Sequence, residues 1–364
     1  PSNSSAASDV YKRQIIYSAL FAMKCLSETP ILLENINKHL FGEDSYVHFV
    51  NLLERIKVAL STNKNIDTKY NVQFFSLLEI LSNTFSELSV HTEIIDKITK
   101  LFMLPDCKDY TTLWSLAKLL RLFFDLKDLR TIFENAGGYT FLKNRLNREI
   151  DFCATNLNIN VNVEYHTKVY STIQFKQLSF LSIIVTLFSK IIYLESNDIV
   201  KNLLDSSILN TLNKILLNIN IFGLGLISQV LEIIDFLLTK DPFFFEILQK
   251  AGTISIVLDN FQKFVAPHSD LLVTLPEVLS TICLNKDGLK EVISKNILQY
   301  LFEPLKNIEL AKILLFNSDS IYIKVLDEMY NDHPELQKLL EDEFLKVLNE
   351  FDRGEYDKNI FMED

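Results

Sequence analysis

The sequence predicts an all-α protein, built as a solenoid of stacked helical hairpins. The 364 residues include only eight glycines and eight prolines, whereas β-rich and nucleotide-binding folds usually need more turn glycines. Apolar residues recur at helical spacing along most of the chain, and signals that end one helix alternate with signals that begin the next. Apolar helix pairs of this kind are half buried until the next pair stacks on them, which favours a solenoid.

The N-terminal residues do not follow this pattern. Residues 1–14, PSNSSAASDVYKRQ, are polar and aperiodic, and they resemble translated adapter or vector sequence, so we exclude them from the fold and expect them to be disordered. Ile15 then begins an apolar helix without an upstream cap, from which we expect the natural chain to have been cut here. Residues 15–105 are predicted to form a first helical block. Its helices are expected near 15–27, 31–41, 45–61, 70–88 and 91–103.

Residues 109–351 are predicted to form a second helical block. Its helices are expected near 109–125, 128–136, 138–156, 168–194, 197–203, 206–219, 223–240, 242–251, 253–265, 270–284, 286–294, 318–331 and 334–351. Stop signals rest on glycine, which tolerates positive φ, and they occur at Ala136-Gly137-Gly138, Ala251-Gly252 and Asp287-Gly288. Start signals alternate with them at Asp109 to Thr111, Asp241-Pro242, Leu275-Pro276 and His333-Pro334.

The string from Leu275 to Leu289, LPEVLSTICLNKDGL, shows one such hairpin in full. Pro276 suits a first helical position because its missing N–H would have no intrahelical partner there. Four residues then share one apolar face at helical spacing: Val278, Leu279, Ile282 and Cys283. Asn285, Asp287 and Gly288 are expected to close the helix, since these residue types tolerate positive φ.

Two segments depart from the repeating pattern. NLNINVNV alternates polar and apolar residues, and we interpret residues 157–167 as a loop that connects two parts of the solenoid. The last helix, 334–351, carries an apolar stripe and is expected to pack as a terminal cap, with Glu341, Asp342 and Glu343 on or near its wet face. Residues 352–364 lack periodicity and are predicted to be a mobile acidic tail.

Composition and charge limit the classes of partner. Asp and Glu number 47 against 36 for Lys and Arg, and the net charge of −11 disfavours direct nucleic-acid binding. The same charge favours proteins as partners, basic ones among them. No small-molecule partner is expected. The longest apolar run, Leu178 to Leu194, is interrupted by serines and a lysine, so we expect no membrane span.

The sequence offers no recognisable reactive centre. It lacks phosphate-binding, dinucleotide-binding, zinc-protease and nucleophile-elbow motifs, and its six histidines are scattered, so we expect neither metal nor cofactor. The basic run Lys143 to Arg148 is interpreted as a solvated helix face. Four isolated cysteines without a C-x-x-C pair suggest free thiols in a reducing compartment, the cytoplasm, the nucleus or both: Cys25, Cys107, Cys153 and Cys283.

Four motifs in order carry a family resemblance. They are AGGYTFLKNRLNREIDFCATN (136–156), FGLGLISQVLEIIDFLLTKDPFFFEILQKAG (222–252), LPEVLSTICLNKDGL (275–289) and VLDEMYNDHPELQ (325–337). The chain resembles the N-terminal arm of the giant HECT-type E3 ubiquitin ligases of the Tom and Mule group, which holds paired conserved domains of unknown function. It departs from the family at Gly223-Leu224, where a glycine-proline step is usual, and in the loop around Asn158 to Val163.

The resemblance implies an armadillo- or HEAT-like solenoid that recruits substrates and acts as a scaffold, far from the catalytic HECT domain. Its partners would be protein substrates and the rest of the ligase chain. The motif positions are expected to be structural: Gly137, Gly138, Arg145, Glu149, Gly223, Pro242, Gly252, Pro276, Cys283, Asn285, Gly288 and Pro334. The residues alone leave open a stand-alone armadillo-like adaptor, such as a phosphatase regulatory subunit or a transport receptor.

Overall fold

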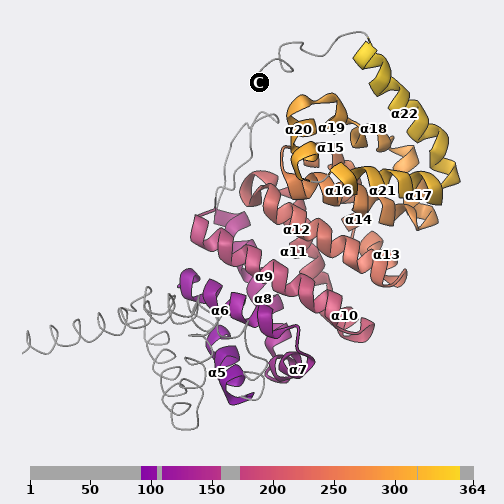
Figure 1. Cartoon of the computed structure of the whole chain (residues 1–364). Helices are drawn as coiled ribbons and strands as arrows, with labels where there is room; N and C mark the ends of the chain where they lie inside the picture. Colours follow the sequence, from indigo (N-terminus) through magenta and orange to yellow (C-terminus); the bar gives the residue numbers. More distant parts are fainter. Residues whose placement is uncertain (1–91, 105–108, 157–172, 318, 353–364) are drawn as a thin grey trace, which may run out of the picture. The chain divides into compact units, whose positions relative to one another are not determined.

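The computed structural model describes residues 92–104, 109–156, 173–317 and 319–352 (Figure 1). Regular structure in these ranges is helical, and none of their residues lies in a strand. The all-α prediction is therefore confirmed. Several predictions fall outside the described residues: the segment 1–14, the four helices expected before residue 91, the loop 157–167 and all but the first residue of the tail 352–364.

The chain divides into two compact units, and the division falls inside one helix, between Arg145 and Leu146. Among the described residues, unit 1 comprises 92–145 and 175–194, and unit 2 comprises 146–174 and 195–352, each with the gaps stated above. The predicted boundary between the two helical blocks lies at 105–108, outside the described residues. That boundary stays a prediction.

Unit 1 is built around aromatic side chains. Its helices are α5 (Thr92–Phe102), α6 (Tyr110–Phe123), α7 (Lys127–Asn135), the first part of α8 (Gly138–Asn156) and α9 (Phe175–Leu194). Helix α6 packs against α5 and α9. The ring of Phe133 is fully buried, with its centroid 5.0 Å from that of Phe124 and 5.8 Å from that of Tyr139. Such large rings bury much apolar area per residue, so they are major contributors to this core.

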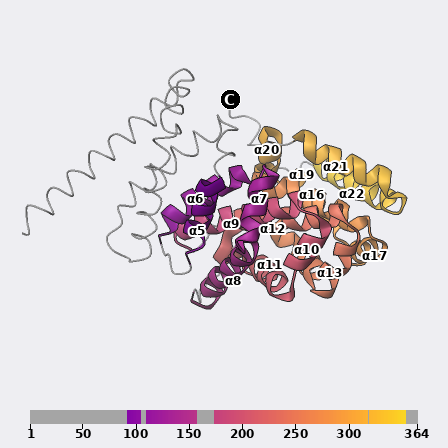
Figure 2. The same ribbon diagram turned by 90° about the horizontal axis from the view of Figure 1, so that it is seen from below.

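Unit 2 holds the rest of α8 and the following helices. They are α10 (Asn197–Leu203), α11 (Ser206–Leu217), α12 (Ile219–Lys240), α13 (Phe243–Lys250), α14 (Thr253–Asp259), α15 (Phe261–Phe264), α16 (Ser269–Cys283), α17 (Lys286–Ser294), α18 (Leu298–Leu301), α19 (Glu303–Lys306), α20 (Ile308–Asn317), α21 (Asp319–Asp332) and α22 (Pro334–Asp352). Helix α16 packs between α12 and α21, and α22 packs on α21 (Figures 1 and 2). In a second row, α11 packs against α14.

The helices from α10 to α16 form two similar groups, which refines the predicted pairs. Two shorter helices precede a longer one in α10, α11 and α12, and again in α13, α14 and α16, where the four-residue α15 lies between the second helix and the third. The groups begin at Asn197 and Phe243, and the next short helix, α17, begins at Lys286. This spacing lies within the roughly 40–47 residues of HEAT and armadillo repeats. Unit 2 is therefore an armadillo-like solenoid.

Side-chain caps explain where several helices begin. The carboxylate of Asp109 accepts a hydrogen bond from the backbone N–H of Thr112, which confirms the predicted start of α6. Asp205 caps α11 by accepting from the N–H groups of Ser207 and Ile208. Such caps satisfy backbone donors that have no partner inside the helix, and each stabilises its helix by about 1 kcal/mol.

Three helices between residues 298 and 317 were not predicted. Helices α18 and α19 are single turns, and Pro304 sits in the first turn of α19, so neither shows a helical apolar repeat. Helix α20, IELAKILLFN, is apolar over most of its length and therefore lacks a clear wet face. Periodicity does not distinguish such a run from other buried segments.

Two helices of the described chain, α9 and α12, are long and apolar enough to cross a membrane by length and composition. Residues buried inside the protein make up 61% of the apolar window in α9 and 67% of that in α12. Neighbouring helices thus already cover most of both, as in the core helices of globular proteins. The expectation that no membrane is involved stays a prediction.

Candidate protein-binding surface

Acidic side chains gather on the surface of unit 2 where α12, α16 and α21 lie side by side. Helix α12 contributes Glu232 and Asp235, one turn apart, and α16 contributes Glu277. We call these three residues the acidic face. Buried leucines and isoleucines on the other side of α12 and α16 fix this orientation, because they turn the opposite side of each helix outward.

The carboxylates of the acidic face disfavour one another's charge. Desolvation by the surrounding protein, followed by repulsion from Asp235, raises the pKa of both Glu232 and Glu277. Burial likewise raises the pKa of Asp235, although a hydrogen bond that the Thr281 hydroxyl donates to its Oδ1 over 2.5 Å acts in the opposite direction. A cation placed here would relieve this repulsion, so the surface suits lysine or arginine side chains of a partner.

Two further carboxylates lie near the acidic face and add to the repulsion between its charges. Asp270 on α16 raises the pKa of Glu232, and Glu328 on α21 raises that of Glu277. Lys324 forms an ion pair with Glu328 over 3.4 Å, so the charge of Glu328 is partly compensated. The sequence reasoning did not find this cluster. The carboxylates at positions 232 and 235 share a helix side, but their proximity to residue 277 depends on which helices pack together.

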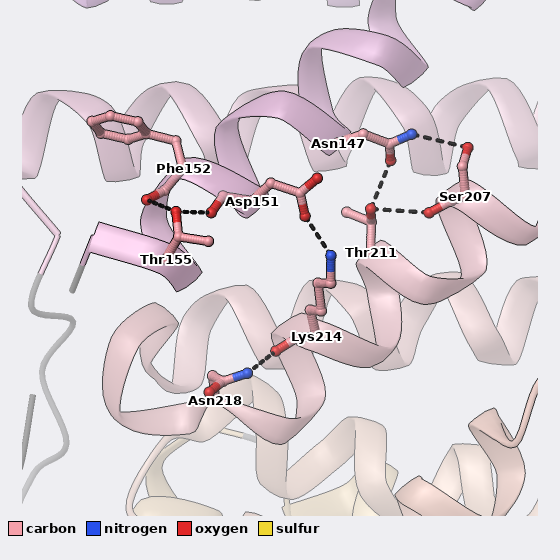
Figure 3. A network of polar contacts seen from close by, with 8 residues as sticks. All are labelled: Asn147, Asp151, Phe152, Thr155, Ser207, Thr211, Lys214 and Asn218. Carbon is pink, nitrogen blue, oxygen red and sulfur yellow. Dashed lines mark hydrogen bonds and ion pairs between the residues drawn. The ribbon is translucent and has the colours of Figure 1, made fainter. Parts of the chain in front are cut away.

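A second polar surface of unit 2 lies between α8 and α11 (Figure 3). Asn147 donates to the hydroxyl of Ser207 over 3.0 Å and accepts from Thr211 over 2.7 Å. One turn further along both helices, Lys214 forms an ion pair with Asp151. These groups already bond to one another, and they join two neighbouring helices. We therefore interpret this network as structural.

Three glycines at predicted motif positions hold a left-handed backbone. Gly137 and Gly252 have φ of +79° and +76°, and each joins two successive helices. No heavy atom within 4 Å would meet a Cβ at either position, so backbone conformation alone explains the glycine. Gly223 has φ of +77° and ψ of +165°, and it forms a kink inside α12.

Two other glycines permit close packing. A Cβ on Gly138 would lie 2.6 Å from the carbonyl oxygen of Phe133, and one on Gly288 would lie 2.3 Å from that of Ile282. Gly288 was expected to end a helix with positive φ, and this is wrong. It lies in the first turn of α17, capped by Asn285, whose side-chain oxygen accepts from the N–H groups of Asp287 and Gly288.

The prolines of the motifs occupy different helix positions. Pro334 is the first residue of α22, and Pro242 directly precedes α13, where Asp241 accepts from the N–H of Phe243 over 2.9 Å. These two predicted starts are confirmed. The start predicted at Pro276 is wrong, because α16 begins at Ser269 and Pro276 lies in its interior. His268 caps this helix with its Nδ1, a residue type that sequence rules do not associate with capping.

The remaining motif residues are buried on α8 and α16. Arg145 is only 4% exposed and its guanidinium stacks on the ring of Phe180, so the interpretation of its basic run as a wholly solvated face is wrong. Glu149 on the same helix is also buried. Burial raises the pKa of the Cys283 thiol to about 12, and burial together with Glu149 raises that of Cys153 to about 11. Neither thiol is activated as a nucleophile.

No metal site is evident in the described part of the chain, where His, Cys, Asp and Glu do not gather in groups of three or more that could hold an ion. A cavity of about 10 Å³ lies beside Pro276, Leu272 and Tyr322. It has room for about one water molecule and none for a cofactor.

Comparison with known protein families shows the family to which the chain belongs. A family described as Domain of Unknown Function, DUF913, matches residues 117–356, which include the acidic face and Gly137, Gly223 and Gly252. This chain belongs to the DUF913 family. The DUF913 match also covers most of unit 2, so the armadillo-like repeats described above belong to this domain.

The relatives of this DUF913 chain are described as ubiquitin ligases. It is 35% identical over 337 residues to the probable E3 ubiquitin-protein ligase TOM1 of Eremothecium gossypii, covering 91% of this chain and 10% of that protein. The E3 ubiquitin-protein ligase TOM1 of Saccharomyces cerevisiae is 32% identical over 329 residues, 89% of this chain and 10% of the relative. UPL2 of Arabidopsis thaliana, an E3 ubiquitin-protein ligase, is 28% identical over 128 residues, 35% of this chain and 4% of UPL2.

These matches confirm the resemblance to the Tom group of ligases. The chain spans about a tenth of the length of the two TOM1 proteins. Among solved structures, a designed armadillo repeat protein, YIII(Dq)4CqI, superposes with a TM-score of 0.46 at 11% identity, over 73% of this chain and 96% of that one. That likeness is too distant to bear on function.

Proposed function

We propose that this chain is a non-catalytic scaffold and substrate-recruiting segment of a HECT-type E3 ubiquitin ligase, and that its acidic face binds basic segments of protein substrates. The proposal is supported mainly by the acidic face, whose carboxylates repel one another. It is also supported by the described residues, which contain no group that could hold a metal ion. The ligase relatives support the pathway. The buried free thiols Cys153 and Cys283 suit the reducing cytoplasm or nucleus.

Binding can be measured by fluorescence anisotropy with a labelled lysine- and arginine-rich peptide, compared with a glutamine-substituted peptide of the same length. We expect the triple variant Glu232→Gln, Asp235→Asn and Glu277→Gln to weaken binding about 3- to 150-fold. An ion pair at a protein surface contributes roughly 0.2–1 kcal/mol, and three such pairs together contribute about 0.6–3 kcal/mol. The affinity should also fall steeply as salt is raised, because exposed charges are screened.

A matched variant controls for net charge. Glu134→Gln, Glu246→Gln and Glu309→Gln together remove the same charge from exposed positions on α7, α13 and α20. If this control weakens peptide binding as much as the acidic-face variant does, the attraction comes from net charge and the assigned surface is wrong.

The non-catalytic part of the proposal has its own test. An E2 enzyme charged with ubiquitin is mixed with the chain, and thioester formation is followed on non-reducing gels. We expect no transfer, since the thiolate forms of Cys153 and Cys283 are disfavoured by burial. Transfer of ubiquitin to any cysteine of this chain would overturn the assignment.

A further inference from the structure

The described residues of the two units carry charge of opposite sign. Unit 1 has ten lysines and arginines against six aspartates and glutamates, whereas unit 2 has fourteen against twenty-six. Part of the charge of unit 2 is turned away from solvent. Glu343 of α22 was expected near the wet face of that helix, but it is buried, because position 343 lies between the buried positions 340 and 347. One of its carboxylate oxygens lies 2.6 Å from Nζ of Lys346. Unit 1 is therefore the part of this acidic chain that suits an anionic partner.

Helix α6 of unit 1 turns one stripe of side chains outward. Trp114 and Lys118 are partly buried and Arg121 is exposed, whereas the residues between them are buried. Positions 114, 118 and 121 follow one another by four and then three residues, so they lie on the same side of the helix. We call these three residues the basic face.

Two side chains of the basic face are already in contact. Nζ of Lys118 lies over the indole of Trp114, 4.9 Å from the ring centroid, which is a cation–π arrangement. This contact restricts both side chains before a partner arrives, so less side-chain entropy is lost on binding. The indole offers apolar area, and Lys118 and Arg121 offer positive charge beside it. Tryptophan and arginine are the residue types that most often dominate binding energy at protein interfaces.

A further cation beside the basic face has a structural role. Lys190 of α9 donates a hydrogen bond to the carbonyl oxygen of Arg121 over 2.8 Å, and its Nζ lies 2.7 Å from Oδ1 of Asp125. Lys190 thereby joins the ends of α6 and α9, which pack side by side (Figures 1 and 2). It also places a positive charge at the C-terminal end of α6, where the helix dipole is negative. We therefore do not count Lys190 with the basic face.

We propose that the basic face of α6 is a docking surface for an acidic protein segment that carries an apolar side chain. The apolar side chain would lie against the accessible part of the Trp114 indole, and carboxylates on either side of it would pair with Lys118 and Arg121. The net positive charge of unit 1 is complementary to such a segment. The inference goes beyond the proposed function and is independent of it, because the acidic face lies in unit 2 and attracts the opposite charge.

A nucleic acid fits the basic face less well than an acidic protein segment does. Affinity for nucleic acid depends on neutralising many phosphates, and the basic face offers two cations on a chain whose net charge is −11. An acidic protein segment needs only a few ionic contacts, and it also gains the apolar contact with Trp114. The balance of charge and apolar area thus favours protein.

The test uses the emission of Trp114, which is the single tryptophan of the chain and therefore reports on this surface. The probe is a peptide rich in glutamate and aspartate that contains leucine and lacks tryptophan. A glutamine-substituted peptide of the same length serves as the comparison. We expect the acidic peptide to change the Trp114 emission until it saturates, and the glutamine peptide to leave it unchanged. The affinity should fall as salt is raised, because exposed charges are screened.

Two variants test the cations of the basic face. Lys118→Gln together with Arg121→Gln should weaken binding of the acidic peptide about 2- to 30-fold, because two surface ion pairs are lost. Arg121→Gln alone leaves the cation over the indole in place and should weaken binding about 1.4- to 5-fold. The matched control is Lys250→Gln with Lys290→Gln, which removes the same charge from side chains of unit 2 that are 79% and 77% exposed. This control should leave the affinity unchanged.

Several results would overturn the proposal. If a labelled acidic peptide binds by fluorescence anisotropy while the Trp114 emission stays constant, the site lies elsewhere on the chain. If the control variant weakens binding as much as the double variant does, net charge and not the basic face attracts the peptide. Absence of binding would also refute the assignment. A single-stranded oligonucleotide of the same charge that binds more tightly than the peptide would reassign the basic face to nucleic acid.

Discussion

Gly288→Ala tests whether close packing between α16 and α17, and not backbone conformation, requires the glycine. The added Cβ would lie 2.3 Å from the carbonyl oxygen of Ile282 and 3.0 Å from a ring carbon of Phe245. Even a close carbon–oxygen contact keeps about 3.3 Å. The junction between the two helices must therefore move by about 1 Å.

That movement sets the magnitude of the effect. Overpacking of a well-packed site costs about 1–3 kcal/mol. It would also disturb the cap in which Asn285 accepts from the N–H of Gly288, and such a cap contributes about 1 kcal/mol. We expect Gly288→Ala to lower the free energy of unfolding by about 3 kcal/mol. Gly252→Ala meets no neighbour and should cost only the roughly 1–2 kcal/mol of a left-handed alanine.

The assay is urea unfolding of both variants, followed by far-UV circular dichroism, with the free energy taken from the midpoint and slope. Both glycines lie in unit 2, so the comparison does not depend on how the two units unfold. A Gly288→Ala variant as stable as Gly252→Ala, or more stable, would refute the argument from close approach.

Three further predictions follow from buried groups. Thr253→Val should raise the free energy of unfolding by about 1 kcal/mol, because the buried Thr253 hydroxyl has no hydrogen-bond partner. Thr281→Val should lower it by about 2 kcal/mol, because it removes the hydrogen bond to Asp235. Urea unfolding of the two variants checks both signs. The carboxyl pKa values of the acidic face are raised in the folded state, so between the ordinary carboxyl pKa and the raised value the folded state binds more protons than the unfolded state. The thermal stability that these groups contribute should therefore rise as pH falls from 7 towards the ordinary carboxyl pKa. Scanning calorimetry of the triple variant should show a smaller rise. Cys153 and Cys283 should resist iodoacetamide at pH 8 in the folded chain and react in urea, as mapped by mass spectrometry; labelling of either in the folded chain would contradict the raised thiol pKa values.

Local rules predicted the helices whose ends are marked by side chains of the same segment. Helices α10 and α17 match their predicted ranges, and α6 begins at the predicted Asp109 cap. At α6 and α17 the capping side chain accepts from backbone N–H groups within one turn, so the cause of the helix start lies in the same segment, whereas Ser196 before α10 makes no side-chain cap hydrogen bond.

The failures depend on contacts distant in sequence. Pro276 appeared to start a helix because proline favours a first turn, yet α16 continues through it, packed between α12 and α21. Gly288 appeared to be a helix end, although its requirement comes from Ile282 and Phe245 on two other helices. The acidic face depends in the same way on which long helices lie side by side. Periodicity indicates that a helix is half buried, but it does not identify the neighbour that buries it.

The kink at Gly223 has a consequence for which sequences this fold accepts. With φ of +77° and ψ of +165°, Gly223 occupies a backbone region that is essentially closed to residues with a side chain. Phe222 and Leu224 on either side of it are both buried. A residue with a side chain at this position would be strained, and relief of that strain would have to move the backbone between these two buried side chains. Natural variation at this single position is therefore restricted by backbone geometry, independently of what the protein binds.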